Sequence, residues 1–343
     1  MSAEHLRGKR VLVTGGTGFV GRHLLPLLLE AGARVTCLTR ACSRTASLPE
    51  GVATARADLH SGAGLAQALE GQEIVIHMAA LLFGFGWQDY LRANARAAAV
   101  LTDALEKAEE VKRVALISSL AAAGPCAVSP GIAEDAAPMP VSAYGWSKLL
   151  VEQTLRPLGE KLVILRPPVI YGSADKGLLP VFRGAARGVA VSPGAFREFP
   201  VSVLHVRDMA RAVLRACAAE TGGVYHLNDG REHTMSGFCR AMGLELHRLT
   251  GRPARGVVRV LRLPLPVMAV TAAFATGFAR FASRFRSFSR APNWNMDKYR
   301  EARQPGWLAD AGRIRREWGW TPVVPLADGL AEAVEGYLRG NML

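Results

Sequence analysis

Short apolar runs alternate along the first two thirds of the chain with longer stretches in which apolar residues recur every three or four positions. The short runs are typical of buried strands and the longer pattern is typical of helices. Strands that are apolar throughout, separated by helices, indicate a parallel sheet covered on both faces. We therefore predict an α/β fold with a doubly wound parallel sheet. The predicted strands are Arg10–Val13, Arg34–Leu38, Ile74–His77, Val114–Ser118, Leu162–Arg166 and Val224–Leu227, and the clearest helices are Phe19–Ala31, Asn94–Ala108 and Tyr144–Leu155.

The alternation stops after Tyr171, where Gly, Pro and Arg become frequent. This composition predicts loops with a short helix over 172–200, and Val201–Ala216 then resembles a strand followed by a helix. Near the end, Ala311–Trp318 and Leu326–Leu338 are predicted to be helices. We expect one domain of residues 1–171, to which 201–228 returns, and a smaller, mostly C-terminal lobe of 172–200 and 229–343, which includes the C-terminal helices.

Composition narrows the class of protein. Half of the 343 residues are apolar and a fifth are charged, so the chain can bury a good core and is not disordered. The five cysteines are odd in number and form no Cys-x-x-Cys pair, which predicts reduced thiols in a cytoplasmic protein without a metal site. The N-terminus runs from a short polar lead into the first strand, with no signal-peptide core.

Most of the net charge of +13 comes from one segment. Between Glu245 and Asp297 there are nine arginines and no acidic residue. Such a block attracts anions, which include phosphate-bearing ligands, anionic lipid and nucleic acid. No zinc-finger spacing or recognition motif accompanies the charge, so we expect no nucleic acid partner.

The first strand ends in the glycine-rich stretch VTGGTGFVG, Val13–Gly21, which leads directly into a helix. Glycines at this spacing permit a tight turn, let the backbone approach a pyrophosphate at the helix N-terminus, and allow the helix to pack closely on the strand. A glycine turn can also be purely structural, but here the strand, the helix and the N-terminal position agree with a dinucleotide site. Its predicted residues are Gly15, Thr17, Gly18, Phe19, Val20 and Gly21.

The end of the second strand bears on the choice of cofactor. An acidic residue there would bind the ribose 2′-hydroxyl of NAD, whereas a nearby arginine suits the 2′-phosphate of NADP. The chain has Thr39 followed by Arg40, with Arg44 close behind. This favours NADP(H) over NAD(H), although Arg40 can also be interpreted as an ordinary surface residue.

A tyrosine and a lysine lie four residues apart in YGWSK, Tyr144–Lys148, on one face of a predicted helix. A nearby ammonium favours the phenolate, so this tyrosine could exchange a proton with an alcohol or carbonyl near neutral pH. The same spacing is common by chance on surface helices. The motif therefore gains its meaning from the rest of the chain.

Several motifs, taken in chain order, resemble the extended short-chain dehydrogenase/reductase family. They are TGGTGFVG, Asp58-Leu59, HMAA at 77–80, Asn94, ISSLAAAG at 117–124, Tyr144-x-x-x-Lys148, RPPVIYG at 166–172, LHVRD at 204–208 and the C-terminal REWGWTPVVPLADGL. The resemblance covers nearly the whole chain. It implies a Rossmann dinucleotide-binding domain, a smaller lobe that binds the substrate, and a helix-mediated homodimer.

The resemblance also implies roles for individual residues. Tyr144 would be the general acid/base and would also contact the cofactor, and Lys148 would lower the pKa of Tyr144 and bind the nicotinamide ribose. Ser119 would hydrogen-bond the substrate oxygen, and Asn94 would hold a water in a proton relay. Asp58 and Leu59 would contact the adenine, Ala79 and Ala80 would line the cofactor, and Pro167 would lie by the nicotinamide.

Departures from the family pattern bear on the substrate. Leu120-Ala121 replaces the Asp-Glu pair of sugar dehydratases, Pro-Pro-Val-Ile at 167–170 lacks the Asn of nucleotide-sugar epimerases, and the loop Leu81–Trp87 is apolar and aromatic. These features favour a lipophilic small molecule and the 3β-hydroxysteroid dehydrogenase or dihydroflavonol reductase-like branch. We expect an alcohol dehydrogenase or ketone reductase; the alternatives are a nucleotide-sugar epimerase and a non-catalytic dinucleotide-binding scaffold.

Five phenylalanines, at 274, 278, 281, 285 and 288, are spaced so that they share one stripe of a helix, with arginines among them. One interpretation is an amphipathic helix whose aromatic face covers the substrate cavity. Another is that residues 263–290 lie on an anionic membrane, with the rings in lipid and the arginines at the headgroups. A membrane span is disfavoured because Pro264 and Pro266 shorten the helical part of a barely long enough apolar run.

Overall fold

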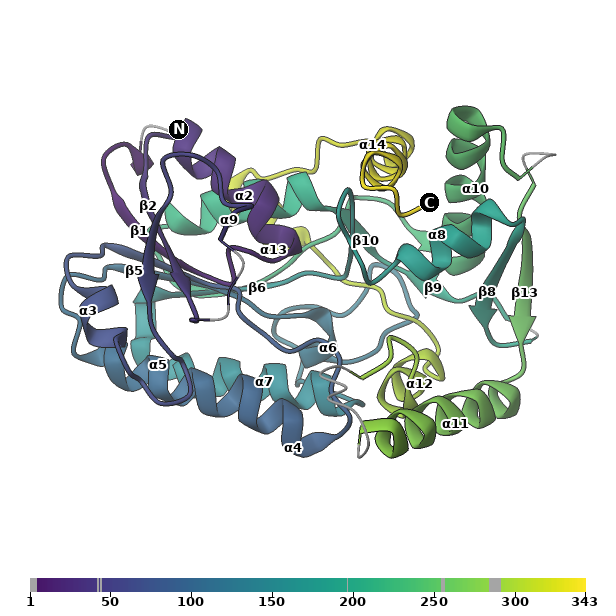
Figure 1. Ribbon diagram of the computed structural model, residues 1–343, viewed down its shortest axis with the longest axis horizontal. Coiled ribbons are helices and arrows are strands. Elements are labelled where there is room, and N and C mark those ends of the chain that lie inside the picture. The colour runs from purple at the N-terminus through teal and green to yellow at the C-terminus, as the bar shows by residue number, and fades with distance from the viewer. Residues whose placement is uncertain (1–4, 42, 44, 196, 254–256, 284–290) are drawn as a thin grey trace.

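The structure is a computed structural model that describes residues 5–41, 43, 45–195, 197–253, 257–283 and 291–343. A seven-stranded parallel sheet forms its larger part (Figure 1). The strand order is β3-β2-β1-β4-β5-β6-β11, which is the doubly wound order with one further strand. The strands are β1 Arg10–Thr14, β2 Arg34–Thr39, β3 Ala53–Arg56, β4 Ile74–His77, β5 Arg113–Ile117, β6 Leu162–Arg166 and β11 Gly223–His226.

All six predicted strands are present, each within one residue of the predicted bounds at either end. The strand that the pattern did not predict is β3, because three of its four side chains are exposed at the edge of the sheet and give no apolar run. The predicted doubly wound α/β class is confirmed.

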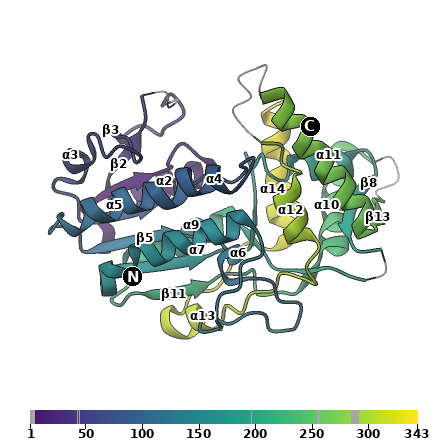
Figure 2. The same cartoon turned by 90° about the horizontal axis from the view of Figure 1, so that it is seen from below.

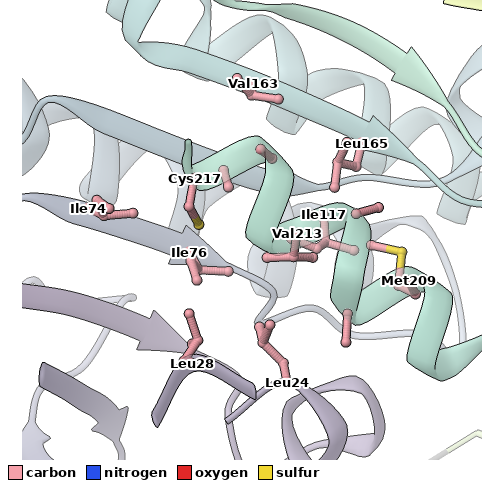
Figure 3. Packing of buried hydrophobic residues seen from close by; sticks show 14 of the residues in the cluster. Leu24, Leu28, Ile74, Ile76, Ile117, Val163, Leu165, Met209, Val213 and Cys217 are labelled. Carbon is pink, nitrogen blue, oxygen red and sulfur yellow. The ribbon is translucent and has the colours of Figure 1, made fainter. Parts of the chain in front are cut away.

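Helices cover both faces of the sheet. On one face, α2 (Phe19–Glu30) packs beside α9 (Val206–Cys217), and their side chains meet those of β4, β5 and β6 in the core shown in Figure 3. On the other face lie α3 (Leu65–Leu69), α5 (Ala97–Glu106) and α7 (Ala143–Leu155). Because both faces are buried, the strands carry no polar alternation, which explains why their apolar runs were readable in the sequence.

A second, smaller apolar core is built mainly from residues that follow Tyr171. It is formed by α8 (Leu179–Ala186), α10 (Met235–Thr250) and α14 (Leu326–Arg339) around the parallel pair of β8 (Val189–Pro193) and β13 (Arg259–Leu263). The short pairs β7 (Val169–Tyr171) with β10 (Val203–His205), and β9 (Pro200–Val201) with β12 (His233–Thr234), stand apart from the large sheet, and Tyr171, Val201 and Val203 belong to this smaller core. Within 172–200 the short helix is present, but β8 was not expected.

The C-terminal part of the chain is shared between the two cores. Helix α13 (Gly312–Trp318) packs on β11, and Ala311, Ile314 and Trp320 belong to the core of the large sheet. The following α14 belongs to the smaller core. The smaller lobe therefore does not contain the whole of 229–343, because residues 311–320 return to the sheet.

Helices α11 (Leu265–Ser283) and α12 (Met296–Ala302) run side by side along one edge of the smaller lobe (Figures 1 and 2). The buried face of α11 consists of Met268, Ala272, Thr276 and Ala279, and the Thr276 hydroxyl accepts a hydrogen bond from the backbone N–H of Met296 at 2.9 Å. The aromatic stripe is not this buried face. Phe274, Phe278 and Phe281 are 76%, 63% and 60% exposed, while Phe285 and Phe288 lie outside the described residues.

Candidate active site

The glycine-rich turn joins β1 to α2 and is shaped by close backbone contacts. Gly15 has a φ of +76°, and a Cβ at this position would come within 2.7 Å of the backbone nitrogen of Ala79. A Cβ on Gly21 would collide with the carbonyl oxygen of Gly16. The Thr14 hydroxyl accepts hydrogen bonds from the backbone N–H groups of Met78 and Ala79, both at 3.2 Å, and so holds the ends of β1 and β4 together.

This turn fits a dinucleotide. Thr17 lies in the turn, and α2 begins after Gly18, which caps it without a side chain, so no side chain competes for the N–H groups of Phe19 and Val20. The first turn of α2 has no acidic residue, which leaves the positive end of the helix open to a pyrophosphate. Ala79 and Ala80 follow β4 after Met78, and the backbone of Ala79 lies against Gly15 of the turn.

The adenosine end of the predicted site lies at the carboxyl ends of β2 and β3. Thr39 is buried and its hydroxyl donates to the carbonyl oxygen of Ala55 at 3.3 Å, whereas Arg40 directly after it is exposed. Asp58 accepts a hydrogen bond from the backbone N–H of His60 at 2.7 Å, and this bond holds the pKa of its carboxyl below the usual value. Leu59 lies between them, partly buried; Arg44 is outside the described residues.

The predicted catalytic side chains come from two neighbouring elements. Ser119 follows β5 and caps the short helix α6 (Leu120–Ala123), where its hydroxyl accepts from the N–H of Ala121 at 3.2 Å. Tyr144 and Lys148 lie one turn apart on α7, which begins after Ser142. The Lys148 ammonium donates to the carbonyl oxygen of Ile117 at 2.7 Å, so β5 also orients this side chain.

Burial acts on both ionisable groups of this helix. It raises the pKa of the Tyr144 phenol, a rise that the nearby Lys298 ammonium and a hydrogen bond with Ser119 oppose. Burial also lowers the pKa of Lys148 to about 8, partly offset by the Glu152 carboxylate. The structure thus brings Ser119, Tyr144 and Lys148 together at the carboxyl end of the sheet, where open α/β sheets bind ligands.

Asn94 is buried in a π-helical turn, Leu91–Arg96, between α4 (Trp87–Tyr90) and α5. Its side-chain oxygen accepts from the backbone N–H of Leu81 at 2.7 Å, and its amide donates to the carbonyl of Leu81 at 3.2 Å and to the Ser147 hydroxyl at 3.0 Å. These bonds tie the loop after β4 to the catalytic helix. A role for Asn94 in a water relay stays a prediction.

A model of the NAD dependent epimerase/dehydratase family matches residues 11–228, which is more than half of the chain. The chain belongs to this family. The matched region holds the glycine turn, Asn94, Ser119, Tyr144 and Lys148, and the predicted membership of the extended short-chain dehydrogenase/reductases is confirmed.

Relatives with assigned activities include reductases. The chain is 30% identical to a ceramide reductase of Caulobacter vibrioides over 260 residues, 75% of this chain and 74% of that one. It is also 30% identical to a putative dihydroflavonol 4-reductase of Synechocystis over 267 residues, 74% and 76% of the two chains. Among solved structures, the Bordetella bronchiseptica enzyme WbmH in complex with NAD⁺ has the same fold, with a TM-score of 0.74 at 20% identity over 97% of this chain and 99% of that one.

In this family member an ionic cluster lies behind the catalytic helix. Glu152 of α7 forms a two-point ion pair with Arg166 of β6, with Arg166 Nε and Nη2 2.9 and 2.6 Å from the two carboxylate oxygens, and both side chains are 5% exposed. Ser118 donates its hydroxyl to the same carboxylate. The cluster fixes α7 to the sheet just below Lys148, and sequence reasoning did not identify it because Glu152 and Arg166 belong to no recognised pair.

Helix α12 also contacts the catalytic helix, at its N-terminus. The Asp297 carboxylate accepts hydrogen bonds from the backbone N–H groups of Ala143 and Tyr144, at 2.6 and 3.1 Å, and Ser142 donates its hydroxyl to Glu301 at 2.7 Å. Sequence analysis missed this contact, since the partners are more than 150 positions apart and Asp297 and Glu301 form no motif.

A cavity of about 300 Å³ lies beside the site, under the loop Leu81–Trp87. Its lining is mixed: apolar side chains from the loop are joined by three polar ones and by residues of the π-helical turn and of the segment before α12. The lining residues are His60, Leu81, Phe83, Gly84, Phe85, Asp89, Arg92, Ala93 and Ala291. Leu81 also packs in the cluster that contains Tyr144, so the cavity adjoins the catalytic side chain through this residue.

Proposed function

We propose that the protein is an NAD(P)-dependent oxidoreductase that transfers a hydride between nicotinamide and a secondary alcohol or ketone of a fairly apolar substrate, such as a sterol, lipid or flavonoid. The observation that carries this proposal is the cluster of Ser119, Tyr144 and Lys148. It lies beside an apolar loop, at the same end of the parallel sheet as the glycine-rich turn. The similarity to a ceramide reductase and a putative dihydroflavonol 4-reductase supports the substrate class.

The chemistry would be divided between the cofactor and the chain. When bound, the nicotinamide supplies or accepts the hydride. Tyr144 exchanges the proton with the substrate oxygen, Ser119 donates a hydrogen bond to that oxygen, and Lys148 favours the phenolate and holds the ribose. Gly15, Gly18 and Gly21 hold the pyrophosphate, and Pro167, whose carbonyl accepts from the Leu120 N–H at 2.8 Å, lies by the nicotinamide.

A substrate panel tests the proposal. Purified protein is given NADPH or NADH with long-chain keto-lipids, sterol ketones, flavonoid ketones and nucleotide sugars, and cofactor oxidation is followed at 340 nm, with the sugars also analysed for epimerised product. We expect turnover of a ketone with a large apolar body. Turnover of nucleotide sugars alone would instead support epimerisation, and cofactor binding without turnover of any compound would support a scaffold.

We also propose a preference for NADP(H), because exposed Arg40 follows β2 where an acidic ribose ligand would otherwise stand. Replacing Arg40 by Ala should raise the KM for NADPH by about 10- to 100-fold, the loss expected for a hydrogen-bonded charge on a phosphate, and leave the KM for NADH unchanged. The matched control is Arg34→Ala, an exposed arginine at the other end of the same strand. Equal effects of Arg40→Ala on both cofactors would refute the preference.

We further propose that the protein collects its substrate at an anionic membrane surface, through α11. Val267, Val270, Phe274, Phe278 and Phe281 recur every three or four residues along this helix, and each is at least 47% exposed. Exposed apolar side chains in so continuous a row are uncommon on soluble surfaces unless they meet a partner. By length and composition alone, α11 could also cross a membrane.

Charge and position favour a bilayer surface as that partner. The helix lies within the segment of nine arginines without acidic residues, and the sequence continues from it into Arg284, Arg286 and Arg290. Near its end, Arg280 donates to the carbonyl oxygen of Phe85 at 2.6 Å, so α11 borders the loop that lines the cavity. A bilayer held against α11 would therefore lie close to the proposed substrate entrance.

Vesicle sedimentation tests the membrane contact. Wild-type protein should sediment with phosphatidylglycerol-rich vesicles at low salt, and Phe274→Asp/Phe278→Asp should reduce the bound fraction at least about tenfold, because each ring loses about 1.5–3 kcal/mol of burial. Leu244→Asp, at an equally exposed position on α10, is the control. No binding of wild-type protein would refute the contact, and binding that resists high salt would point to insertion of α11.

A further inference from the structure

The amino end of the catalytic helix is held by a second helix that contributes three charged side chains to the site. On α12, Asp297 accepts from the first N–H groups of α7 and Glu301 accepts from the Ser142 hydroxyl. Lys298 lies between these two carboxylates in sequence. Because Asp297 and Glu301 fix α12 at both of its ends, the Lys298 side chain is directed towards Tyr144.

The position of Lys298 is defined by three contacts. Its ammonium nitrogen lies 4.8 Å from the centre of the Tyr144 ring and 5.8 Å from that of Phe83, and it donates a hydrogen bond to Glu301 at 2.8 Å. A cation within about 6 Å of a ring face is attracted by the ring, so the contact with Tyr144 is favourable even before the phenol ionises. Only about a quarter of the side chain is exposed, so solvent and salt screen its charge less than they would at the surface.

Lys298 is expected to remain charged. Burial disfavours its ammonium, but the Glu301 carboxylate and the neighbouring phenols of Tyr144 and Tyr90 raise the pKa of Lys298 above its ordinary value. Lys148, by contrast, has a pKa lowered to about 8 and its ammonium is hydrogen-bonded to Ile117. Of the two lysines near the catalytic phenol, Lys298 therefore keeps its positive charge to higher pH.

We propose that Lys298 is a second cation of the active site, which stabilises the ionised form of the Tyr144 side chain and so supports proton transfer in either direction. The inference rests on the proposed role of Tyr144 as the proton-exchanging group. Lys298 acts through Tyr144 and is in this sense a positioning residue, supplied by the lobe that would also bind the substrate. Its contribution would thus be absent unless α12 is seated on α7.

Other polar and charged groups also surround Tyr144, and together they determine in which direction its pKa should move when Lys298 is replaced. Glu301 on α12 raises the pKa of Tyr144, and the hydrogen bond with the Ser119 hydroxyl after β5 lowers it. The ring of Tyr90, a residue of α4, has its centre 6.0 Å from that of the Tyr144 ring. The Asp297 carboxylate accepts from the backbone N–H of Tyr144, and Lys148 lies one helical turn further along α7. Removing the Lys298 charge leaves the Glu301 carboxylate without this cation, so the phenol should become harder to ionise.

A spectroscopic titration tests the inference without any substrate. The absorbance of phenolate near 295 nm is measured against pH for wild-type protein, Lys298→Met, Lys298→Gln and Lys298→Arg. For each protein, the curve of the same protein with Tyr144→Phe added is subtracted, so that the difference reports Tyr144 alone. In the two neutral variants we expect the midpoint of Tyr144 to rise by about 1–2 pH units, as one charge at this distance implies. Lys298→Arg should restore the wild-type midpoint.

The variants separate an electrostatic role from a structural one. The amide of Lys298→Gln can still donate to Glu301, so α12 keeps its anchoring contacts if Lys298→Met does not fold. Arg303→Met removes an equal charge from an exposed position at the end of the same helix and should leave the midpoint unchanged. Once a substrate is known, the pH at which kcat/KM changes with the ionisation of Tyr144 should rise by the same amount in the neutral variants.

An unmoved midpoint in folded Lys298→Gln would overturn the inference, and so would a midpoint that Lys298→Arg fails to restore. A raised midpoint in a protein that turns over no alcohol or ketone would leave Lys298 as a partner of Tyr144 and refute the proposed oxidoreductase function instead. The two failures are therefore distinguishable.

Discussion

Tyr144→Phe should lower kcat by a factor on the order of 10³, the middle of the range for loss of a positioned acid or base. The ring is buried against Tyr90 and Ala121, so the substitution keeps its packing and removes the single atom that could exchange a proton. Dinucleotide affinity should change little, because the substitution keeps the ring and the glycine turn that holds the pyrophosphate lies between β1 and α2. The measurement is steady-state turnover of the best substrate from the panel, with cofactor binding followed by fluorescence.

Tyr337→Phe is the matched control, since Tyr337 is another fully buried tyrosine, in the smaller core, whose hydroxyl has no hydrogen-bond partner among the described residues. It should retain turnover. Tyr144→Phe with undiminished kcat and intact cofactor binding would contradict proton exchange by Tyr144. Loss of cofactor binding along with turnover would show that the phenol serves the dinucleotide site instead.

The parts of this site that the sequence predicted are those encoded by neighbouring residues. The glycine turn needs only a strand, a few glycines and a helix in succession, and Tyr144 and Lys148 need only one helical turn. Buried parallel strands are apolar over most of their length and do not alternate with polar residues, so the sheet was also readable. Its edge strand β3 was not, because an exposed strand lacks the apolar run that identifies the others.

The parts that could not be predicted depend on contacts between distant segments. No local pattern shows that Asp297 would cap α7, or that Lys298 would lie over the Tyr144 ring, because those contacts form only after the two lobes fold together. The direction of the aromatic stripe was equally hidden. Spacing shows that Phe274 and Phe278 share a face, but only the packing of Ala272 and Thr276 on the other side shows that this face points outward.

Glu152→Leu should lower the free energy of unfolding by about 3–5 kcal/mol, the cost of leaving one member of a buried ion pair without its partner. Arg166 would remain charged beneath the sheet, 3.4 Å from His226, and an imidazole, whether neutral or protonated, has no negative charge that could replace the lost carboxylate. Ser118 would also lose its acceptor. Urea denaturation followed by circular dichroism measures the loss.

A second substitution determines whether the cost comes from the stranded charge or from the shape of the site. Glu152→Leu/Arg166→Leu removes both charges and should recover much of the stability, because an apolar pair can replace a buried ion pair at little cost. Arg248→Leu, in an ion pair whose arginine is 62% exposed, should cost less than about 1 kcal/mol. If the double variant were as unstable as Glu152→Leu, the cluster would stabilise the protein through its hydrogen-bond geometry. The hydrogen bond from Lys148 to Ile117 would then be the first contact of the active site to be lost.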